Sequence, residues 1–167
     1  MKAHSYQIEY TELSADELPE AVQSLINQAK EAAEKAYAPY SQFKVGCAVL
    51  LANGTILTGS NHENAAYPAG ICAERAALSA LDMTPAAPKV LQLAIQYVYT
   101  SVNAASSTSY ITPCGICRQT ILEVQQWQGT PIEIYMCSPN NHVLKVANAN
   151  NLLPFAFGKD YLQSDAQ

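Results

Sequence analysis

The segment from Val90 to Tyr99 (VLQLAIQYVY) constrains the fold most strongly, because nearly all of its residues are apolar or aromatic. Such a run is typical of a strand covered on both faces, so we expect it at the centre of a sheet. The segment from Phe43 to Leu51 alternates apolar residues on one face, and Asn53-Gly54 then forms the turn to a second antiparallel strand over residues 55–59. Alternation predicts a further strand at Ile132, Ile134 and Met136.

Three other segments have the composition and spacing of helices. The first begins at Asp16, a candidate N-cap that leaves Pro19 in the first turn, and continues to Tyr37. The other two are predicted over residues 72–81 and 114–127, the latter ended by Gly129. A hairpin followed by alternating helices and strands predicts an α/β fold, a three-layer α/β/α sandwich with a central mixed five-stranded sheet.

Composition limits the classes of protein that this chain can belong to. Its 167 residues are 49% hydrophobic, which suits one globular domain and excludes a disordered chain. We expect residues 1–16 to form an N-terminal extension and residues 17–167 a single domain. The net charge of −5 disfavours a nucleic-acid partner. No apolar run approaches about 20 residues, and the first residues do not resemble a signal peptide, so we expect no membrane contact and a cytoplasmic location.

The cysteines give the first indication of chemistry. An odd number of cysteines, five, indicates metal binding or catalysis in the cytosol rather than a disulfide framework. Cys72 stands at one predicted helix start, and Cys114 and Cys117 form a C-x-x-C pair at another. Helix N-termini favour thiolates, so three sulfurs can converge on a zinc ion there. Three ligands leave the fourth zinc position open for water, which is the layout of a catalytic site.

Charged residues beside these cysteines suit the same chemistry. Glu74, two residues from Cys72, is placed to act as a general acid and base, which takes a proton from the water and delivers protons to a ring nitrogen and a departing amine. C-x-E followed by P-C-x-x-C is the pattern of zinc deaminases that act on nucleobases. Arg75 can offset the negative charge of three thiolates by donating to the sulfurs, and Arg118 is a second candidate for this role.

The chain resembles the small, homotetrameric type of cytidine deaminase from about Leu18 to Phe157. Five stretches carry the resemblance in the same order: residues 38–46 (APYSQFKVG), 59–68 (GSNHENAAYP), 72–75 (CAER), 113–119 (PCGICRQ) and 152–157 (LLPFAF). The resemblance implies that residues 17–167 are a catalytic domain. It also implies one Zn²⁺ ion per subunit, held by Cys72, Cys114 and Cys117, with Glu74 as the proton shuttle.

The resemblance further implies a set of substrate contacts. Asn61 and Glu63 would hydrogen-bond the ribose, and Phe43 would stack on the pyrimidine. The backbone around Ala73 would recognise the pyrimidine ring. The spacing agrees, because Asn61 and Glu63 alternate along an extended segment and can face one side. Three more positions match residues that complete the pockets of neighbouring subunits in a homotetramer, namely Ala65, Tyr67 and Phe157.

The expected activity is hydrolytic deamination of cytidine and deoxycytidine to uridine and deoxyuridine with release of ammonia, a step of pyrimidine salvage. A deaminase of another cytosine-bearing compound, such as blasticidin S, is an alternative with the same chemistry. A non-catalytic zinc-stabilised binding module, with Cys47 or Cys137 as a fourth ligand, is an alternative of a different class. Editing of RNA or DNA uses the same zinc core, but the acidic charge balance disfavours it.

Simpler interpretations of single residues stay open. Glu74 can favour a helix start, the two arginines can be surface cations, and Asn61 and Glu63 can shape a turn. The aromatic candidates can serve ordinary packing. His62, the N-terminal extension and the loop over residues 100–112 depart from the usual family pattern. We expect a solvated His62, and a loop that alters access near C4 of the base so that modified cytosines are accepted.

Overall fold

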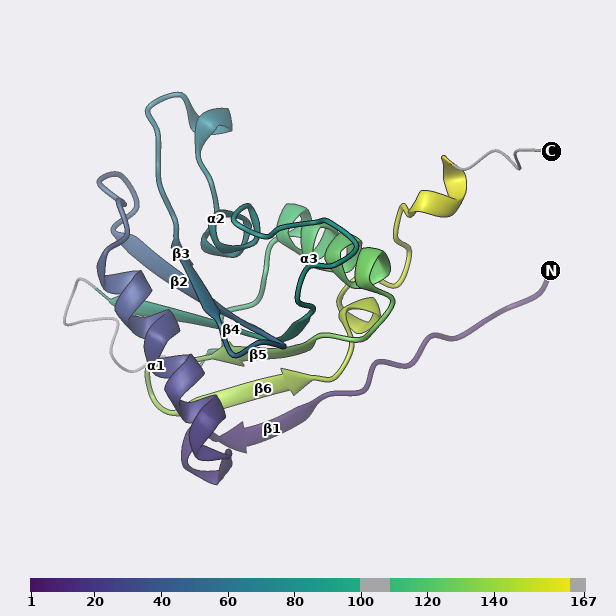
Figure 1. Ribbon diagram of the computed structural model, residues 1–167, viewed down its shortest axis with the longest axis horizontal. Helices are drawn as coiled ribbons and strands as arrows, with labels where there is room; N and C mark the ends of the chain where they lie inside the picture. The colour runs from purple at the N-terminus through teal and green to yellow at the C-terminus, as the bar shows by residue number, and fades with distance from the viewer. Residues whose placement is uncertain (100–108, 163–167) are drawn as a thin grey trace.

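The computed structural model describes residues 1–99 and 109–162, and it has one mixed sheet as its central layer (Figure 1). The described part contains six strands in the order β1-β6-β5-β4-β2-β3. Only β4 and β5 pair in parallel there, and the other neighbours are antiparallel. The strands are β1 (Thr11–Ser14), β2 (Phe43–Leu51), β3 (Ile56–Ser60), β4 (Val90–Tyr99), β5 (Glu133–Cys137) and β6 (His142–Val146). The predicted α/β class and mixed sheet are confirmed, and β4 lies inside the sheet as its apolar sequence predicts.

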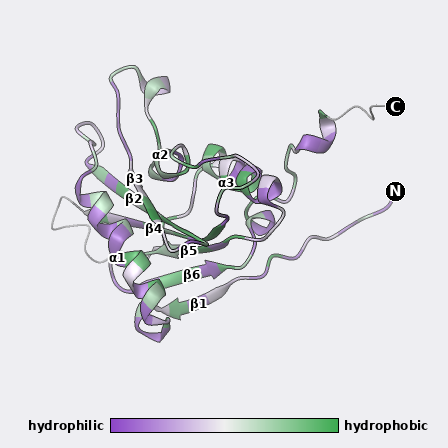
Figure 2. Ribbon diagram, viewed as in Figure 1, coloured by the Kyte–Doolittle hydropathy of each residue, from purple (hydrophilic) through white to green (hydrophobic). Residues whose placement is uncertain are grey.

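Helices cover both faces of the sheet and create two hydrophobic cores. On one face, α1 (Glu20–Glu34) packs through Val22, Leu25 and Ala29 against Ala48 and Ala94 of the central strands. On the other face, α2 (Ala73–Leu78) and α3 (Gly115–Gln128) pack over the larger core, which includes Cys47, Leu93 and Ile121. Hydrophilic and hydrophobic residues accordingly alternate around α1 in Figure 2. The predicted three layers are confirmed.

The sequence patterns assign residues to four of the strands, and they miss both β6 and a sixth strand of the sheet. This strand, β1, comes from the segment expected to be only an extension, and its Thr11 and Ser14 pair with Lys145 and His142 of β6. Its sequence, TELS, is short and polar, so it has no apolar alternation to mark it as a strand. The residues before β1 also contact the body of the protein, because the Asn151 side chain donates to the backbone carbonyl of Glu9. The expectation of five strands was therefore wrong by one.

The start of the first helix also differs from the prediction. Residues 15–17 form a 3₁₀ turn, and Pro19, not Asp16, is the N-cap of α1. Leu18 is extended (φ −85°, ψ 153°), as the residue before a proline usually is, and this breaks the helical path between Asp16 and Glu20. The Asp16 carboxylate instead accepts a hydrogen bond from Asn141 at 2.7 Å.

Close packing of α2 against the sheet places the start of that helix. A Cβ atom on Gly59 of β3 would lie 2.3 Å from the backbone nitrogen of Ala77 and 2.6 Å from the carbonyl oxygen of Ala73. Only glycine therefore allows α2 to lie this near the strand. The helix ends at Leu78, three residues earlier than predicted.

Two sequence expectations concern other parts of the chain. The predicted loop over residues 100–112 lies mostly outside the described residues, which resume at Ser109 and lead into α3. Gly129 ends α3 with a left-handed backbone (φ 69°), as predicted. In residues 1–99 and 109–162, no helix combines the length and apolar character that a membrane crossing needs.

Candidate active site

Three cysteine sulfurs meet where two helices begin. Cys72 is the N-cap of α2 and Cys114 the N-cap of α3, and Cys117 lies in the first turn of α3. The Sγ atom of Cys114 is 3.7 Å from that of Cys72 and 3.4 Å from that of Cys117. All three sulfurs lie within 4.8 Å of one another. The structure thus brings together the three residues that the motif predicted as ligands.

The donor set and its spacing fit a zinc ion. Tetrahedral coordination with Zn–S bonds of about 2.3 Å places sulfur atoms about 3.8 Å apart, close to the observed distances. All five cysteines are free thiols. Soft thiolate ligands select zinc over harder ions such as Mg²⁺. Cys72, Cys114 and Cys117 would hold the ion and leave one coordination position for water or substrate.

The remaining two cysteines are not part of this cluster. Within the described residues the group that could hold a metal contains Cys72, Cys114 and Cys117 alone. Cys47 and Cys137 are buried in strands β2 and β5. Burial, together with the Glu74 charge, raises the pKa of Cys47 well above its usual value, and burial raises that of Cys137 to about 12. Both therefore stay protonated core residues, which weakens the hypothesis of a four-cysteine structural site.

One thiol of the cluster ionises readily. Hydrogen bonds from Cys117 and then Cys114, together with the positive charge of Arg75, outweigh partial burial and lower the pKa of Cys72 to about 6. The first thiolate of the cluster therefore forms near neutral pH at the start of a helix, where a metal ligand is needed.

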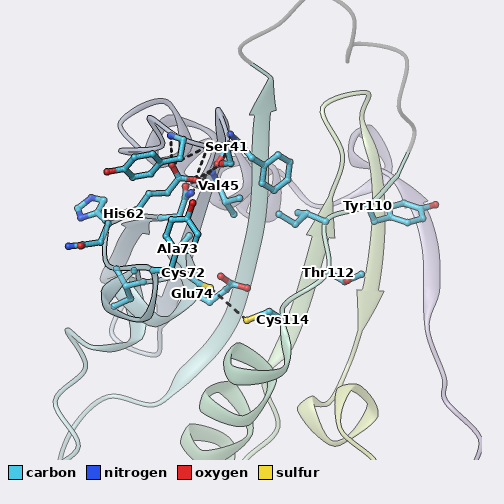
Figure 3. Close-up of a pocket in the computed structure, with 18 residues that line it drawn as sticks. Ser41, Val45, His62, Cys72, Ala73, Glu74, Tyr110, Thr112 and Cys114 are labelled. Atoms are coloured by element: carbon cyan, nitrogen blue, oxygen red, sulfur yellow. Dashed lines mark hydrogen bonds between the residues drawn. The ribbon is translucent and has the colours of Figure 1, made fainter.

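Glu74 is a buried carboxyl beside the sulfurs. Its side chain is only 4% exposed, at the second position of α2. Burial, and then the charge of Cys72, raise the pKa of Glu74 above its ordinary value. Figure 3 shows its carboxyl group between Cys72 and Cys114. A buried carboxyl with a raised pKa is suited to accept a proton and release it again near neutral pH.

A cavity of about 900 Å³ opens above this cluster. In Figure 3, Ser41, Val45 and His62 lie on one side of it, Tyr110 and Thr112 on the other, and the cysteines at its base. Five of the predicted substrate-binding residues line it, namely Phe43, Asn61, Glu63, Tyr67 and Ala73, together with Glu74, Cys72 and Cys114. The predicted residues Ala65, Phe157, Arg75 and Arg118 are not among the lining residues of this single chain.

The Asn61 side chain fixes the adjacent strand β2. Its Oδ1 atom accepts a hydrogen bond from the backbone of Val45 at 2.8 Å, and its Nδ2 atom donates to the carbonyl of Phe43 at 2.9 Å. Each amide atom keeps one further hydrogen-bonding position. Asn61 thus positions Phe43 and still has capacity to contact a ligand in the cavity.

Glu63 holds the turn before β2. Its carboxylate accepts hydrogen bonds from the backbone of Tyr40 at 2.8 Å and of Ser41 at 3.3 Å, and from the Ser41 hydroxyl. The Ser41 hydroxyl and then these backbone amides lower the pKa of Glu63. Glu63 is therefore an anion at the mouth of the cavity, and its oxygens keep lone pairs for a ligand.

Aromatic rings flank the same mouth. The ring of Phe43 is 42% exposed and rests on Tyr97, with centroids 5.3 Å apart. The exposed face suits stacking on a flat base. Tyr67 is 78% exposed and makes an edge contact with Tyr40, at 6.3 Å between centroids. His62, between Asn61 and Glu63, is exposed, and its Nε2 atom lies 3.4 Å from the Ser60 hydroxyl.

The two arginines differ in their contacts. Arg75 is close enough to Cys72 to lower its pKa. Arg118 donates through Nε to the carbonyl of Pro113 at 2.8 Å and through Nη1 to that of Leu152 at 3.2 Å. These bonds tie the segment before Cys114 to a distant turn, so Arg118 supports the position of the ligand through the backbone.

Residues near the C-terminal end of the described chain lie apart from the cavity. Phe157 is 57% exposed and stacks on Tyr161, with centroids 5.3 Å apart. Its carbonyl accepts a hydrogen bond from Gln119 of α3 at 2.8 Å. Ala65 is also exposed. Within one chain these two predicted residues do not complete the pocket.

Sequence reasoning missed Ser41 as part of the site. Ser41, Tyr40 and Val45 line the cavity, and Ser41 contacts Glu63 directly. The available signal was the stretch 38–46, which carries the family resemblance beyond Phe43 alone.

Comparisons with known proteins agree with this geometry. Residues 19–128 match the model of the cytidine and deoxycytidylate deaminase zinc-binding region. The cytidine deaminase of Sporosarcina psychrophila is 34% identical over 146 residues, which cover 87% of this chain and 98% of that protein. The cytidine deaminase of Mycobacterium tuberculosis is 38% identical over 138 residues, which cover 83% of this chain and 90% of that protein.

A solved structure supports the same relationship. The crystal structure of cytidine deaminase from Burkholderia pseudomallei superposes with a TM-score of 0.67 at 35% identity, over 81% of this chain and 98% of that one. The motif, the thiol cluster, the buried carboxyl and the similarity over most of the chain agree, and this chain belongs to the cytidine and deoxycytidylate deaminase family.

Proposed function

We propose that this protein is a zinc-dependent hydrolytic deaminase that converts cytidine and deoxycytidine to uridine and deoxyuridine with release of ammonia. The observation that carries the proposal is the convergence of three thiols and the buried Glu74 at the base of a cavity lined by Phe43, Asn61 and Glu63. Zinc, when bound, supplies Lewis-acid activation of the water that attacks C4 of the base.

The residues of the chain supply the proton transfers and the orientation. Water adds its oxygen to C4, and Glu74 takes the proton that this oxygen loses. Glu74 delivers this proton to the ring nitrogen. It then carries the remaining proton of the new C4 hydroxyl to the amino group, the C4–N bond breaks, ammonia leaves, and the C4–O bond becomes the carbonyl of uridine. Ala73 is the first residue of α2, where backbone N–H groups have no partner within the helix, and this suits contact with the carbonyl oxygen of the base.

The lining of the cavity favours a free nucleoside over a nucleotide. Glu63 and Asn61 offer a carboxylate and an amide, which suit the hydroxyl groups of a sugar. No lysine or arginine is among the described residues that line the cavity, whereas Glu63 and Glu74 are acidic. A phosphate on the sugar would bring about two negative charges to an acidic site without a cation to pair with them. We therefore expect cytidine to be preferred over its monophosphate.

The loss of cytidine absorbance tests the activity. Wild-type protein should convert cytidine, and Glu74→Gln should retain zinc while losing at least about 100-fold in kcat, the contribution expected of a general acid and base. Glu31→Gln, a matched change on the exposed face of α1, should leave kcat unchanged. If the wild type binds zinc and leaves cytidine intact, the substrate is another cytosine-bearing compound.

We further propose a homotetramer in which neighbouring subunits complete each pocket. Among the aromatic residues exposed in the single chain, Tyr67, Phe155 and Phe157 are more than half exposed. Large exposed aromatic groups of this kind are typical of interaction surfaces. The family resemblance assigns Ala65, Tyr67 and Phe157 to these shared pockets.

Subunit mixing separates a shared pocket from simple association. Sedimentation at assay concentration should give four subunits. Phe157→Ala and Glu74→Gln should each be poorly active, and mixed tetramers should regain activity, because one subunit supplies Phe157 and another Glu74. Tetramers without recovery would contradict the shared pocket, and an active monomer would contradict the assembly.

The proposed compartment is the cytoplasm, where the enzyme would act in pyrimidine salvage. All five cysteines are free thiols, as expected of proteins from a reducing compartment. Cell fractionation would test this location, and recovery of the protein outside the cytosol would contradict it.

A further inference from the structure

The turn that precedes β2 is built around the Ser41 hydroxyl. This hydroxyl donates to Oε1 of Glu63 and accepts a hydrogen bond from the backbone of Phe43 at 3.0 Å. One side chain therefore contacts both the carboxylate at the mouth of the cavity and the backbone of the ring that faces the cavity. Both Glu63 and Phe43 line the cavity together with Ser41.

The backbone carbonyl of Phe43 also has a side-chain partner that lines the cavity. Asn61 donates to the carbonyl of Phe43 at 2.9 Å, while Ser41 accepts from its amide at 3.0 Å. Phe43 is thus fixed on both sides by side chains that line the cavity, and its ring rests on Tyr97. These polar contacts hold the backbone from which the ring projects, at a residue that is 42% exposed.

The backbone between Ser41 and Phe43 is strained. Gln42 has φ 58°, a left-handed conformation that non-glycine residues seldom adopt. Its amide donates to the carbonyl of Ala38 at 3.1 Å, and its side chain donates to that of Pro39 at 3.0 Å. Such strain persists where the surrounding contacts hold it, and it is common at ligand-binding sites. The contacts of Ser41 with Glu63 and Phe43 are two of those that hold this turn.

We propose that Ser41 is a positioning residue, whose hydroxyl joins the sugar-binding carboxylate of Glu63 to the backbone of Phe43 and so fixes the two substrate contacts relative to each other. This inference rests on the proposed function. The Ser41 hydroxyl donates to Oε1 and the Tyr40 amide donates to Oε2, and the carboxylate keeps further lone pairs that a ligand can use. The same hydrogen bond is the main cause of the lowered pKa of Glu63.

The expected effect is on substrate binding. Ser41→Ala should raise KM for cytidine about 3- to 10-fold, the worth of one partly exposed hydrogen bond, and leave kcat within about twofold. Ser41→Thr, which keeps the hydroxyl, should restore much of the loss. Ser24→Ala, on the exposed surface of α1 and not among the residues lining the cavity, is the matched control and should behave as wild type.

Two comparisons separate positioning through Glu63 from a general structural effect. With 2′,3′-dideoxycytidine, which lacks the sugar hydroxyls that Glu63 would bind, the KM penalty of Ser41→Ala should shrink to about twofold or less. In Glu63→Gln the further change to Ser41→Ala should cost less than in wild type, because coupled residues are not additive. Equal penalties on both substrates, or additive losses, would overturn the proposal.

The link between Ser41 and Glu63 can also be tested without measuring enzyme activity. The pKa of Glu63, followed by carboxyl NMR, should rise in Ser41→Ala and not in Ser24→Ala. An unchanged pKa in Ser41→Ala would contradict the link to Glu63. Should Ser41→Ala fail to fold, Ser41→Cys, with its weaker donor, carries the same tests. Wild-type protein that leaves cytidine unchanged would instead contradict the proposed function, so the two failures are distinguishable.

Discussion

The sulfur atoms of Cys72 and Cys114 lie 3.7 Å apart, although the two cysteines are 42 residues apart in the chain. They meet because α2 and α3 begin at the same place on one face of the sheet, where each cysteine is the N-cap. The site therefore depends on the packing of two helices and not on any single segment.

Replacement of one ligand should remove the metal. We expect Cys114→Ser to lose at least about 90% of the bound zinc, because a neutral hydroxyl is a far weaker ligand than a thiolate. Zinc content by mass spectrometry of the folded protein measures this. Cys137→Ser should keep one zinc per chain. Loss of zinc from the Cys137→Ser variant would favour a four-cysteine structural site.

The close approach of α2 to β3 should make Gly59 hard to replace. Gly59→Ala places a methyl group against backbone atoms of Ala73 and Ala77, and overpacking of this kind costs about 1–3 kcal/mol, or more where the backbone must shift. We expect urea unfolding to show this loss together with weaker zinc binding. Gly115→Ala is the control, since its Cβ would meet nothing within 4 Å. Equal stability of the two variants would contradict the packing argument.

Arg118 should influence the metal through the backbone. Arg118→Ala removes the hydrogen bonds to Pro113 and Leu152 that hold the segment before Cys114. We expect zinc affinity to fall about 10- to 100-fold, as for other groups that orient metal ligands. Competition with a chelating dye measures this. Arg118→Lys, which can reach one carbonyl, should have a zinc affinity between those of the wild type and Arg118→Ala. Unchanged zinc affinity in both variants would contradict a role of Arg118 in supporting the ligand.

An ion pair between β5 and β6 gives stability that depends on pH. Lys145 lies 2.6 Å from Glu133, which also accepts from Gln92 and Tyr135. Burial alone would raise the pKa of Glu133, but these partners outweigh it and lower the pKa. A carboxyl whose pKa is lower in the folded state stabilises the protein above its unfolded pKa, about 4.3, and this stability is lost as pH falls through the folded pKa.

Lys145→Met should therefore destabilise the protein at pH 7 by about 0.5–1.5 kcal/mol, a modest value because both groups are partly exposed. The unfolding free energies of variant and wild type should converge as pH falls from about 5 to 2. Lys30→Met, an exposed change on α1, should show no such convergence. A difference that stays constant with pH would point to packing of the lysine stem instead.

Strong local patterns predicted most of the fold and the metal site. The bounds of β2 and β4 agree with their alternating and continuous apolar residues, and the cysteines of the two motifs do converge. Weak patterns failed. The polar β1 is a strand only because β6 offers a partner, which begins with the pairing of Ser14 and His142, 128 residues apart in the chain. Likewise, the bonds of Asn61 to β2 and of Glu63 to the turn before β2 depend on tertiary contact, which residue spacing does not encode.

The pairing of β1 with β6 has a consequence for how the protein is made. Ser14 is paired with His142, so β1 leaves the ribosome well before the strand β6 with which it forms its hydrogen bonds. Until then the growing chain carries unsatisfied backbone groups along its outer strands, a recognised aggregation hazard. Once paired, the polar TELS strand covers the outer edge of β6. A protein shortened by removal of residues 1–14 would expose that edge permanently, and we expect it to form inclusion bodies more readily than the full chain.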